Sequence, residues 1–207
     1  MSYASAEIRK VLSQFEGKQM LRGYIPCNLT GGGTANYFGG PNPERYNPMG
    51  ISGVTVGTGV DLGQTDIPTL KKIGVCDETI EIVRPYVGKE KKAAVVALHA
   101  APLTISKEVA DELDRCMIDH HILIIANRYD RDAGKGAFEQ LPWQAQAVIT
   151  SILYQRGVNS PSKFKSTWQA LVARNWKKAA KDFQTPSLWN GYMSRRRAEG
   201  KILEQLC

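Results

Sequence analysis

The sequence lacks any apolar run of the length that crosses a membrane. Runs such as residues 122–126 are far shorter than the roughly 20 apolar residues that a spanning helix needs. The first ten residues, MSYASAEIRK, contain no apolar core of the kind found in secretory signals. We therefore expect no transmembrane helix, no membrane association and no signal peptide. Work outside a cytoplasm would then require delivery by another system.

Cysteine and histidine are also scarce, with 4 and 3 residues respectively. The cysteines stand far apart with no C-x-x-C pair, which excludes the usual zinc pattern and a disulfide framework, so we expect incidental thiols. The adjacent His120 and His121 would point about 100° apart on a helix and could not readily share a metal. We expect neither a metal nor a cofactor. The cysteines are Cys27, Cys76, Cys116 and Cys207.

Glycine-rich phosphate loops are absent as well. Gly57 and Gly59 follow a strand-like run, but the next glycine, Gly63, is one position late for a dinucleotide fingerprint, and Pro68 interrupts the helix that should follow. No Lys-Ser or Lys-Thr follows residues 31–33 closely enough for a phosphate loop. These departures argue against nucleotide binding.

What the sequence does have is an excess of positive charge toward its end. The chain carries 27 basic and 20 acidic residues, a net charge of +7, of which residues 156–201 contribute +9. A basic segment attracts polyanions such as nucleic acid, acidic lipid or an anionic wall polymer, and it also fits solvated helix faces. No nucleic-acid-reading motif accompanies the charge, so we expect no nucleic-acid partner.

The pattern along the chain predicts an α+β fold in one domain, residues 1–207. Apolar spacing predicts a helix over residues 4–16, with Ser5 as its N-cap and its end near Glu16. Residues 17–66 are rich in glycine and turn residues, with a short strand or hairpin at 51–63, and form the expected β lobe. The expected helical lobe covers 67–207 together with the first helix. Its helices are expected at 79–87, 89–99, 106–129, 142–157, 163–183 and 189–206.

Carboxylates and a hydroxyl are the remaining candidates for chemistry. Glu16 ends an amphipathic helix, where partial desolvation would raise its pKa and keep it protonated near neutrality. Thr55 and Asp61 stand six positions apart in the strand region and would share one face of a regular strand, although the intervening glycines make regularity doubtful. A protonated Glu facing an ionised Asp is a layout that cleaves glycosidic bonds. Each acid taken alone also fits a surface charge.

Five stretches resemble phage-type lysozymes in order along the chain. The first two are LSQFEG, at the end of residues 6–17, and GVTVGTGVDLG, residues 53–63. The other three are residues 102–119, 141–158 and 191–205, the last containing Arg-Arg-x-Ala-Glu. The form with Asp just after the Thr-x-Gly-x-Gly turn resembles the pesticin-type toxin domain in particular. The resemblance implies a lysozyme-like fold, with a small glycine-rich β lobe and a larger helical lobe flanking a cleft.

The resemblance also implies roles for three residues. Glu16 would be the general acid, Asp61 the second carboxylate, and Thr55 would orient the attacking water. The glycines flanking Thr55 would let substrate approach the backbone. Many phage lysozymes place the Asp soon after the Glu, but this sequence has no Asp between Glu16 and Asp61, which leaves Glu44 as an outside rival. Thr55 also follows Glu16 by 39 positions, more than the family usually allows, and the insert either extends the substrate groove or decorates it.

The expected function is therefore that of a muramidase, which cleaves the β-1,4 bond between N-acetylmuramic acid and N-acetylglucosamine. Its partners would be the peptidoglycan strand and, in a toxin producer, an immunity protein, and we expect a monomer. It would act in the periplasm or on the wall of a target or host bacterium, as a bacteriocin domain, a type VI secretion effector or a phage endolysin. Alternatives are a lytic transglycosylase, an inactive wall-binding module and a basic nucleic-acid-binding helical protein.

Overall fold

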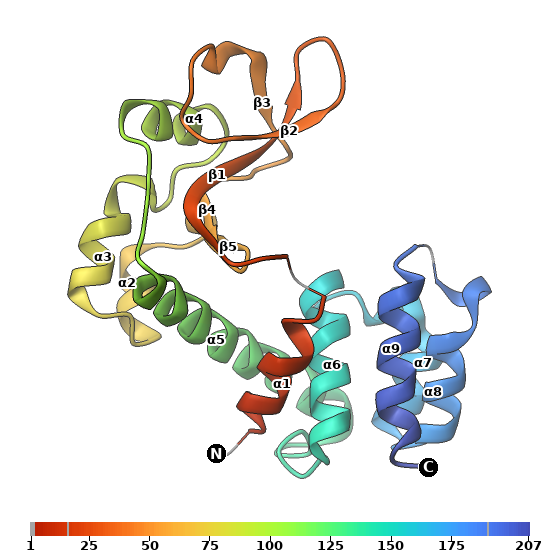
Figure 1. The fold of residues 1–207 in the computed structure, drawn as a ribbon. Helices are drawn as coiled ribbons and strands as arrows, with labels where there is room; N and C mark the ends of the chain where they lie inside the picture. Colours follow the sequence, from red (N-terminus) through yellow and green to blue (C-terminus); the bar gives the residue numbers. More distant parts are fainter. Residues whose placement is uncertain (1–2, 16, 190) are drawn as a thin grey trace. The chain divides into compact units, whose positions relative to one another are not determined.

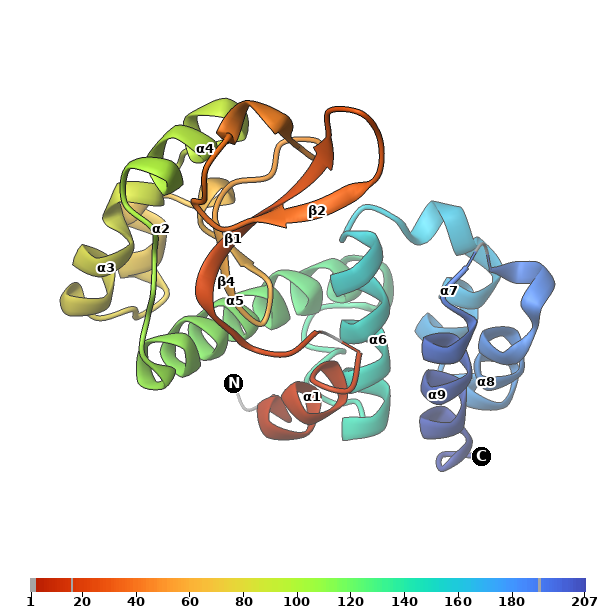
Figure 2. The ribbon, with the colours of Figure 1, turned by 45° about the horizontal axis from the view of Figure 1, so that its top comes forward.

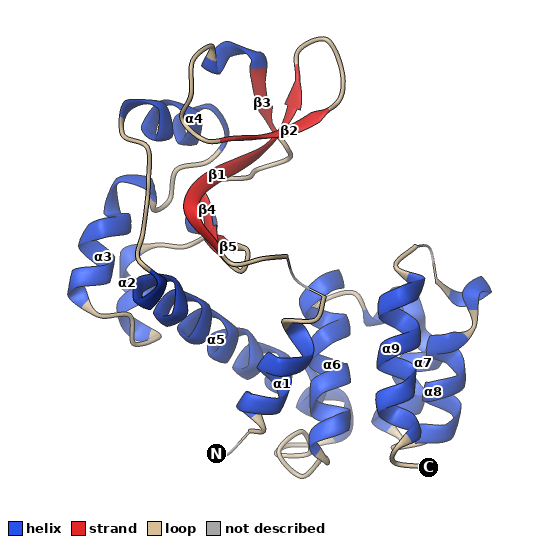
Figure 3. Ribbon diagram, viewed as in Figure 1, coloured by secondary structure: helices blue, strands red, loops and turns tan. Residues whose placement is uncertain are grey.

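The computed structural model describes residues 3–15, 17–189 and 191–207. The chain divides into two compact units (Figure 1): the first is Met1–Phe15 with Ile118–Cys207, and the second is Glu16–Met117. Helix α5 (Lys107–Ala133) begins in the second unit and ends in the first. Within the described ranges all β-strands belong to the second unit (Figure 3). The predicted α+β class is confirmed.

The second unit is built on an antiparallel sheet of five strands in its described residues. The strand order is β2-β1-β4-β5, and β3 pairs with β1 as well. Ile25 and Cys27 of β1 are buried, and they pack with Val54 and Val56 in one hydrophobic cluster. The strands are β1 (Met20–Leu29), β2 (Thr34–Tyr37), β3 (Tyr46–Pro48), β4 (Thr55–Gly57) and β5 (Val60–Asp61).

Helices complete the core of the second unit. Leu70 of α2, Ile80 and Val83 of α3 and Leu98 of α4 are fully buried in the same cluster as the strands. Figure 2 shows α4 beside the strands, and it contacts both β1 and β3. These elements are α2 (Ile67–Lys72), α3 (Asp77–Val83) and α4 (Lys91–Ala100), with 3-10 turns η1 (Pro43–Arg45), η2 (Leu62–Gln64) and η3 (Arg84–Tyr86).

The first unit is helical and has its own hydrophobic cluster. Ile8 of α1, Ile125 of α5, Ile152 of α6 and Phe183 of α8 are all fully buried in it. Helix α1 packs against α6, and helix α8 packs against α9. The helices of each pair lie side by side in Figures 1 and 2. The elements are α1 (Ser5–Leu12), α6 (Trp143–Arg156), α7 (Lys165–Val172), α8 (Trp176–Gln184) and α9 (Met193–Glu204), with 3-10 turns η4 (Pro161–Phe164) and η5 (Pro186–Leu188). None of the described helices is both long and apolar enough to cross a membrane.

The division between the units differs from the lobe boundary expected at residue 66. Helices α2, α3 and α4 and the start of α5 lie with the strands, because their apolar side chains are buried in the same cluster as the sheet. The ten-residue strand β1 also lies within a segment that the sequence indicates as mainly loop. Gly23 and Pro26 are residues that strands disfavour. Pairing with β2, β3 and β4 stabilises β1 despite these two residues.

Two expected helices differ in the structure: one is shorter than predicted and the other is divided in two. The first runs from Ser5 to Leu12 rather than to Glu16, and Ala4 is its N-cap in place of Ser5. Beyond Leu12 the chain tightens, because the N–H of Phe15 bonds the carbonyl of Leu12 only three residues back. The helix expected over 163–183 is two helices, α7 and α8, since Arg174 adopts a positive φ of 55° between them.

Candidate active site

The hairpin formed by β4 and β5 brings Thr55 and Asp61 together. The two residues are direct partners across the antiparallel pair, and partners of this kind project their side chains from the same face of a sheet. Thr55 is also the partner of Tyr24 on β1. Tyr24, Thr55 and Asp61 therefore form a row across three adjacent strands, on the face opposite the buried Ile25 and Val56. Thr55 and Asp61 therefore do not lie on one regular strand. A turn at Thr58 and Gly59 reverses the chain between them, so that they face each other from two paired strands.

Peptide N–H groups hold the carboxylate of Asp61 in place. Its Oδ1 accepts hydrogen bonds from the N–H of Gly63 at 2.9 Å and of Gly53 at 3.1 Å, and its Oδ2 accepts from Gly53 at 3.2 Å. The oxygens are thus unequally bonded, and Oδ2 has more capacity left to accept a bond from a water molecule. This arrangement orients the carboxylate without using a cationic side chain.

The glycines around Asp61 are required by the packing of the backbone. A Cβ on Gly53 would lie 2.7 Å from Asp61 Oδ1 and 2.5 Å from the Cα of Gly63, and a Cβ on Gly63 would lie 2.6 Å from the carbonyl oxygen of Lys89. Any side chain at either position would push the two backbone segments apart. The glycine before Thr55 therefore has a structural reason: it lets a peptide N–H reach the carboxylate of Asp61.

Burial raises the pKa of Asp61 above its ordinary value. The loss of hydration is the largest cause, the hydrogen bonds from Gly53 and Gly63 act in the opposite direction, and the charge of Glu90 raises the pKa further. A carboxylate with a raised pKa is a stronger base than a free aspartate. Asp61 is therefore suited to accept a proton from water or to stabilise positive charge beside it.

Tyr24 belongs to this row, although it lies in the long insert between Glu16 and Thr55. Burial raises the pKa of the Tyr24 phenol, and the charge of Asp61 raises it further. The phenol therefore stays protonated as a hydrogen-bond donor. Its ring lies 6.1 Å from that of Phe38. Sequence spacing could not identify Tyr24, because its place beside Thr55 comes from the pairing of β1 with β4.

Asp114 of α5 anchors the turn between β4 and β5, a role that no pattern in the sequence predicts. Its carboxylate accepts hydrogen bonds from the N–H and the hydroxyl of Thr58, both at 2.7 Å, and from the amide of Gln19 at 2.9 Å. Gly57 passes so close that a Cβ there would lie 2.3 Å from Asp114 Oδ1. Asp114 thereby positions the hairpin rather than acting on a substrate.

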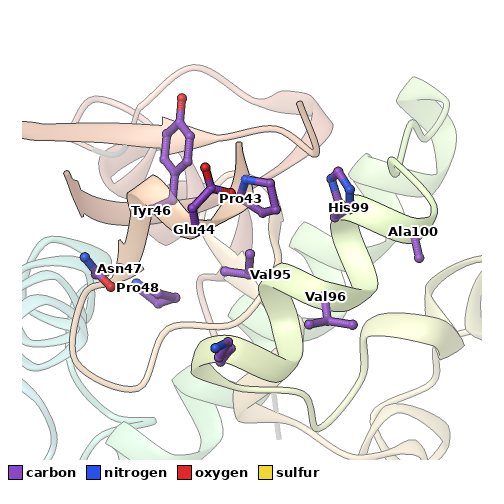
Figure 4. Close-up of a pocket in the computed structure, with 10 residues that line it drawn as sticks. Pro43, Glu44, Tyr46, Asn47, Pro48, Val95, Val96, His99 and Ala100 are labelled. Carbon is purple, nitrogen blue, oxygen red and sulfur yellow. The ribbon is translucent and has the colours of Figure 1, made fainter. Parts of the chain in front are cut away.

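The row formed by Tyr24, Thr55 and Asp61 in the described residues leaves two other acidic candidates, Glu16 and Glu44. Glu16, the expected general acid, lies outside the described residues. The residue before it, Phe15, packs against the hydrophobic cluster of the first unit, with the guanidinium of Arg195 4.9 Å from its ring centre. The outside rival Glu44 lies on η1 and lines a cavity of about 400 Å³ together with residues of α4 (Figure 4). Neither Thr55 nor Asp61 is among that cavity's lining residues.

Two arginines of the basic segment are part of the core of the first unit. Arg196 and Glu199 of α9 are both fully buried and paired at 2.9 Å, and Arg195 is 3.3 Å from the same carboxylate oxygen. Ser151 donates a further hydrogen bond to Glu199. Burial raises the pKa of Glu199 to about 6. The Arg-Arg-x-Ala-Glu stretch therefore has a structural role in ion pairing.

Metal and disulfide chemistry find no support in the described residues. No group of three or more His, Cys, Asp or Glu side chains is arranged there to hold a metal ion. The four cysteines form no disulfide with one another in the same part of the chain.

The comparison with protein families agrees with the resemblance. Residues 8–177 match the family model of pesticin, described as a bacterial toxin homologue of phage lysozyme, C-terminal part. Among curated proteins, none matches the chain. The match covers most of the chain, including Thr55, Asp61, the whole hydrophobic cluster of the second unit and most of that of the first. The chain therefore belongs to the pesticin family of bacterial toxin homologues of phage lysozyme.

Proposed function

We propose that this chain is a muramidase, which hydrolyses the β-1,4 bond between N-acetylmuramic acid and N-acetylglucosamine in peptidoglycan. The observation that carries the proposal is the pairing of Thr55 with Asp61 across the hairpin, in a chain of the pesticin family. A glycosidic bond breaks when an acid protonates the leaving oxygen while a second carboxylate deals with the attacking water or with the positive charge on the sugar. The hairpin supplies the second carboxylate and a neighbouring hydroxyl.

Each residue has a distinct role in the proposed reaction. Glu16 donates the proton to the glycosidic oxygen. Asp61, oriented by the N–H groups of Gly53 and Gly63, accepts a hydrogen bond from the attacking water or stabilises the developing charge. The hydroxyl of Thr55, directly across the hairpin, orients that water. This division of work uses no metal or cofactor.

We also propose a biological setting, which membership of a toxin family supports. In this setting the chain is a single catalytic domain that acts as a monomer on the wall of a target bacterium. A bacteriocin domain or a type VI secretion effector fits the toxin family, and an endolysin would use the same chemistry. A producing cell would need an immunity protein. The basic surface of the first unit would favour contact with polyanionic wall polymers.

The clearing of purified sacculi tests the proposal. We expect the wild type to reduce the turbidity of a sacculus suspension and Glu16→Gln to abolish that activity. Glu7→Gln is the matched control, since Glu7 is an exposed acid of α1, and it should clear sacculi at the wild-type rate. A Glu16→Gln protein that clears sacculi normally would exclude Glu16 as the acid.

A further inference from the structure

A second pocket of the sheet unit has the chemistry of an anion site. It has a volume of about 270 Å³ and contains two arginines and two asparagines but no acidic side chain. An aromatic ring, that of Phe38, forms part of its wall. The lining residues used below are Arg22, Asn36, Phe38, Asn42 and Arg45. The pocket lies in the long insert between Glu16 and Thr55, for which the sequence leaves two explanations open.

The two guanidinium groups are not neutralised by the protein. Arg22 donates a hydrogen bond to the carbonyl oxygen of Phe38 at 3.1 Å and lies over the Phe38 ring at 5.2 Å, which fixes its direction. The backbone of Arg45 bonds Thr30 and Asn42, but its guanidinium has no hydrogen-bond or ion-pair partner among the described residues. A guanidinium can bind a carboxylate through two parallel hydrogen bonds. The pocket therefore offers two cations to an anionic ligand.

The pocket adjoins the candidate active site on the same face of the sheet. Arg22 and Tyr24 are two positions apart on β1, and both contact the ring of Phe38. Tyr24 in turn is the cross-strand neighbour of Thr55, which pairs with Asp61. A row of neighbouring side chains thus leads from the candidate pair to Arg22, and Arg45 lines the same pocket as Arg22.

We propose that Arg22 and Arg45 bind a carboxylate on the peptide branch of the glycan strand. The inference rests on the proposed function, because that function supplies a substrate whose sugar chain carries acidic peptides. While the sugar ring lies at Thr55 and Asp61, its peptide branch reaches along Tyr24 and Phe38 to the arginines. Asn36 and Asn42 line the same pocket and offer amide groups to the peptide backbone. The insert thereby selects strands that carry peptides.

Binding of a peptide probe tests the subsite apart from catalysis. Isotope-labelled protein is titrated with the tripeptide L-alanyl-γ-D-glutamyl-L-lysine while the backbone amide signals of Asn36, Phe38 and Asn42 are followed by NMR. We expect saturable shifts in the wild type and about five- to tenfold weaker binding in Arg22→Gln/Arg45→Gln, the range for two exposed ion pairs. The same peptide with its carboxylates amidated should bind as weakly as it does to the double variant.

Two controls separate the subsite from general charge and from folding. Lys72→Gln/Arg84→Gln removes the same charge from exposed positions of the same unit and should bind the tripeptide like the wild type. Arg45→Gln alone changes an exposed side chain with no hydrogen bond or ion pair among the described residues, so it should weaken binding without changing the free energy of unfolding, which denaturant unfolding checks.

The outcomes distinguish the subsite from the proposed function. Absent shifts in the wild type, or equal binding in the double variant, would overturn the subsite even if sacculi are cleared. Shifts with N-acetylmuramic acid but not with the tripeptide would also overturn it, since the carboxylate would then belong to the sugar's lactyl group. Arginine-dependent binding of the tripeptide by a protein that clears no sacculi would support the subsite and refute the muramidase.

Discussion

At the scale of single residues, the unusual feature is how Asp61 is held. Two peptide N–H groups orient its carboxylate, yet burial and the charge of Glu90 outweigh them and raise its pKa. A raised pKa means that the carboxylate takes up a proton at a higher pH than a free aspartate does. If Asp61 is the second carboxylate, activity should therefore be lost in acid as Asp61 becomes protonated.

The pH profile of sacculus clearing tests this limit. Activity should fall as the pH drops through the raised pKa of Asp61, because protonation removes the charge that the reaction uses. On the acid side of the pH–activity profile, the midpoint of the fall should therefore lie at a higher pH than an ordinary aspartate would give. Asp61→Asn should lose roughly 10²- to 10⁴-fold in kcat, the range for a removed general acid or base. An unchanged acid limb in a fully active Asp61→Asn would refute the role of Asp61.

The hydroxyl of Thr55 gives a second prediction at this scale. Thr55→Val keeps the β-branched shape of this nearly buried residue, 6% exposed, and removes only the hydroxyl. We expect kcat to fall about 10- to 100-fold with little change in KM, because water is positioned for the chemical step. Thr55→Ser, which keeps the hydroxyl, should retain most of the activity. Equal losses in the two variants would indicate a packing role instead.

At the scale of elements, the hairpin depends on Asp114 of helix α5. Asp114→Ala removes the acceptor of two hydrogen bonds from Thr58 and one from Gln19. We expect a loss of about 1–3 kcal/mol in the free energy of unfolding, since three part-buried donors lose their acceptor. Asp111→Ala, on an exposed position of the same helix, should cost less than about 1 kcal/mol. Denaturant unfolding measures both, and equal losses would contradict the anchoring role.

Helix α9 contains a buried ion pair that can be tested in the same way. Glu199→Gln leaves the fully buried Arg196 without its carboxylate, and removing one partner of such a pair costs about 3–5 kcal/mol. Arg197→Gln, the exposed next position on the helix, should change stability by no more than about 0.5 kcal/mol. Thermal unfolding of both variants decides the matter, and a stable Glu199→Gln protein would show that the pair is dispensable.

The sequence predicts some elements much better than others. Helices such as α5 and α6 are foreseen because apolar residues repeat at the helical period over many positions. The break between α7 and α8 is missed, since it depends on the positive φ of Arg174, a conformation that any propensity argument disfavours at arginine. Strand β1 is missed because its stability comes from three partner strands rather than from its own pattern.

The candidate site shows the same limit. Thr55 and Asp61 are found from their residue types and from the family resemblance, and the hairpin explains their spacing. Tyr24 and Asp114 are not found, because each reaches the hairpin from a segment distant in the sequence. The residues that we propose for the chemistry are thus predictable from residue type and resemblance, whereas Tyr24 and Asp114 depend on contacts that only the structure reveals.

At the scale of the whole molecule, the two units have separate hydrophobic clusters and different charge. The basic segment, residues 156–201, lies entirely in the first unit, whereas Thr55 and Asp61 lie in the second. Burial of Arg195 and Arg196 removes two of its cations from the surface. In the proposed function, the remaining lysines and arginines would attract an anionic wall, and the sheet unit would supply the second carboxylate.

The central claim is that the chain hydrolyses peptidoglycan through Glu16. Its most direct test is mass spectrometry of the fragments released from purified peptidoglycan by the wild type and by Glu16→Gln. Our account predicts fragments with reducing N-acetylmuramic acid ends from the wild type and none from the variant. Anhydro ends would indicate a transglycosylase, and an absence of wild-type fragments, or their equal release by the variant, would contradict the account.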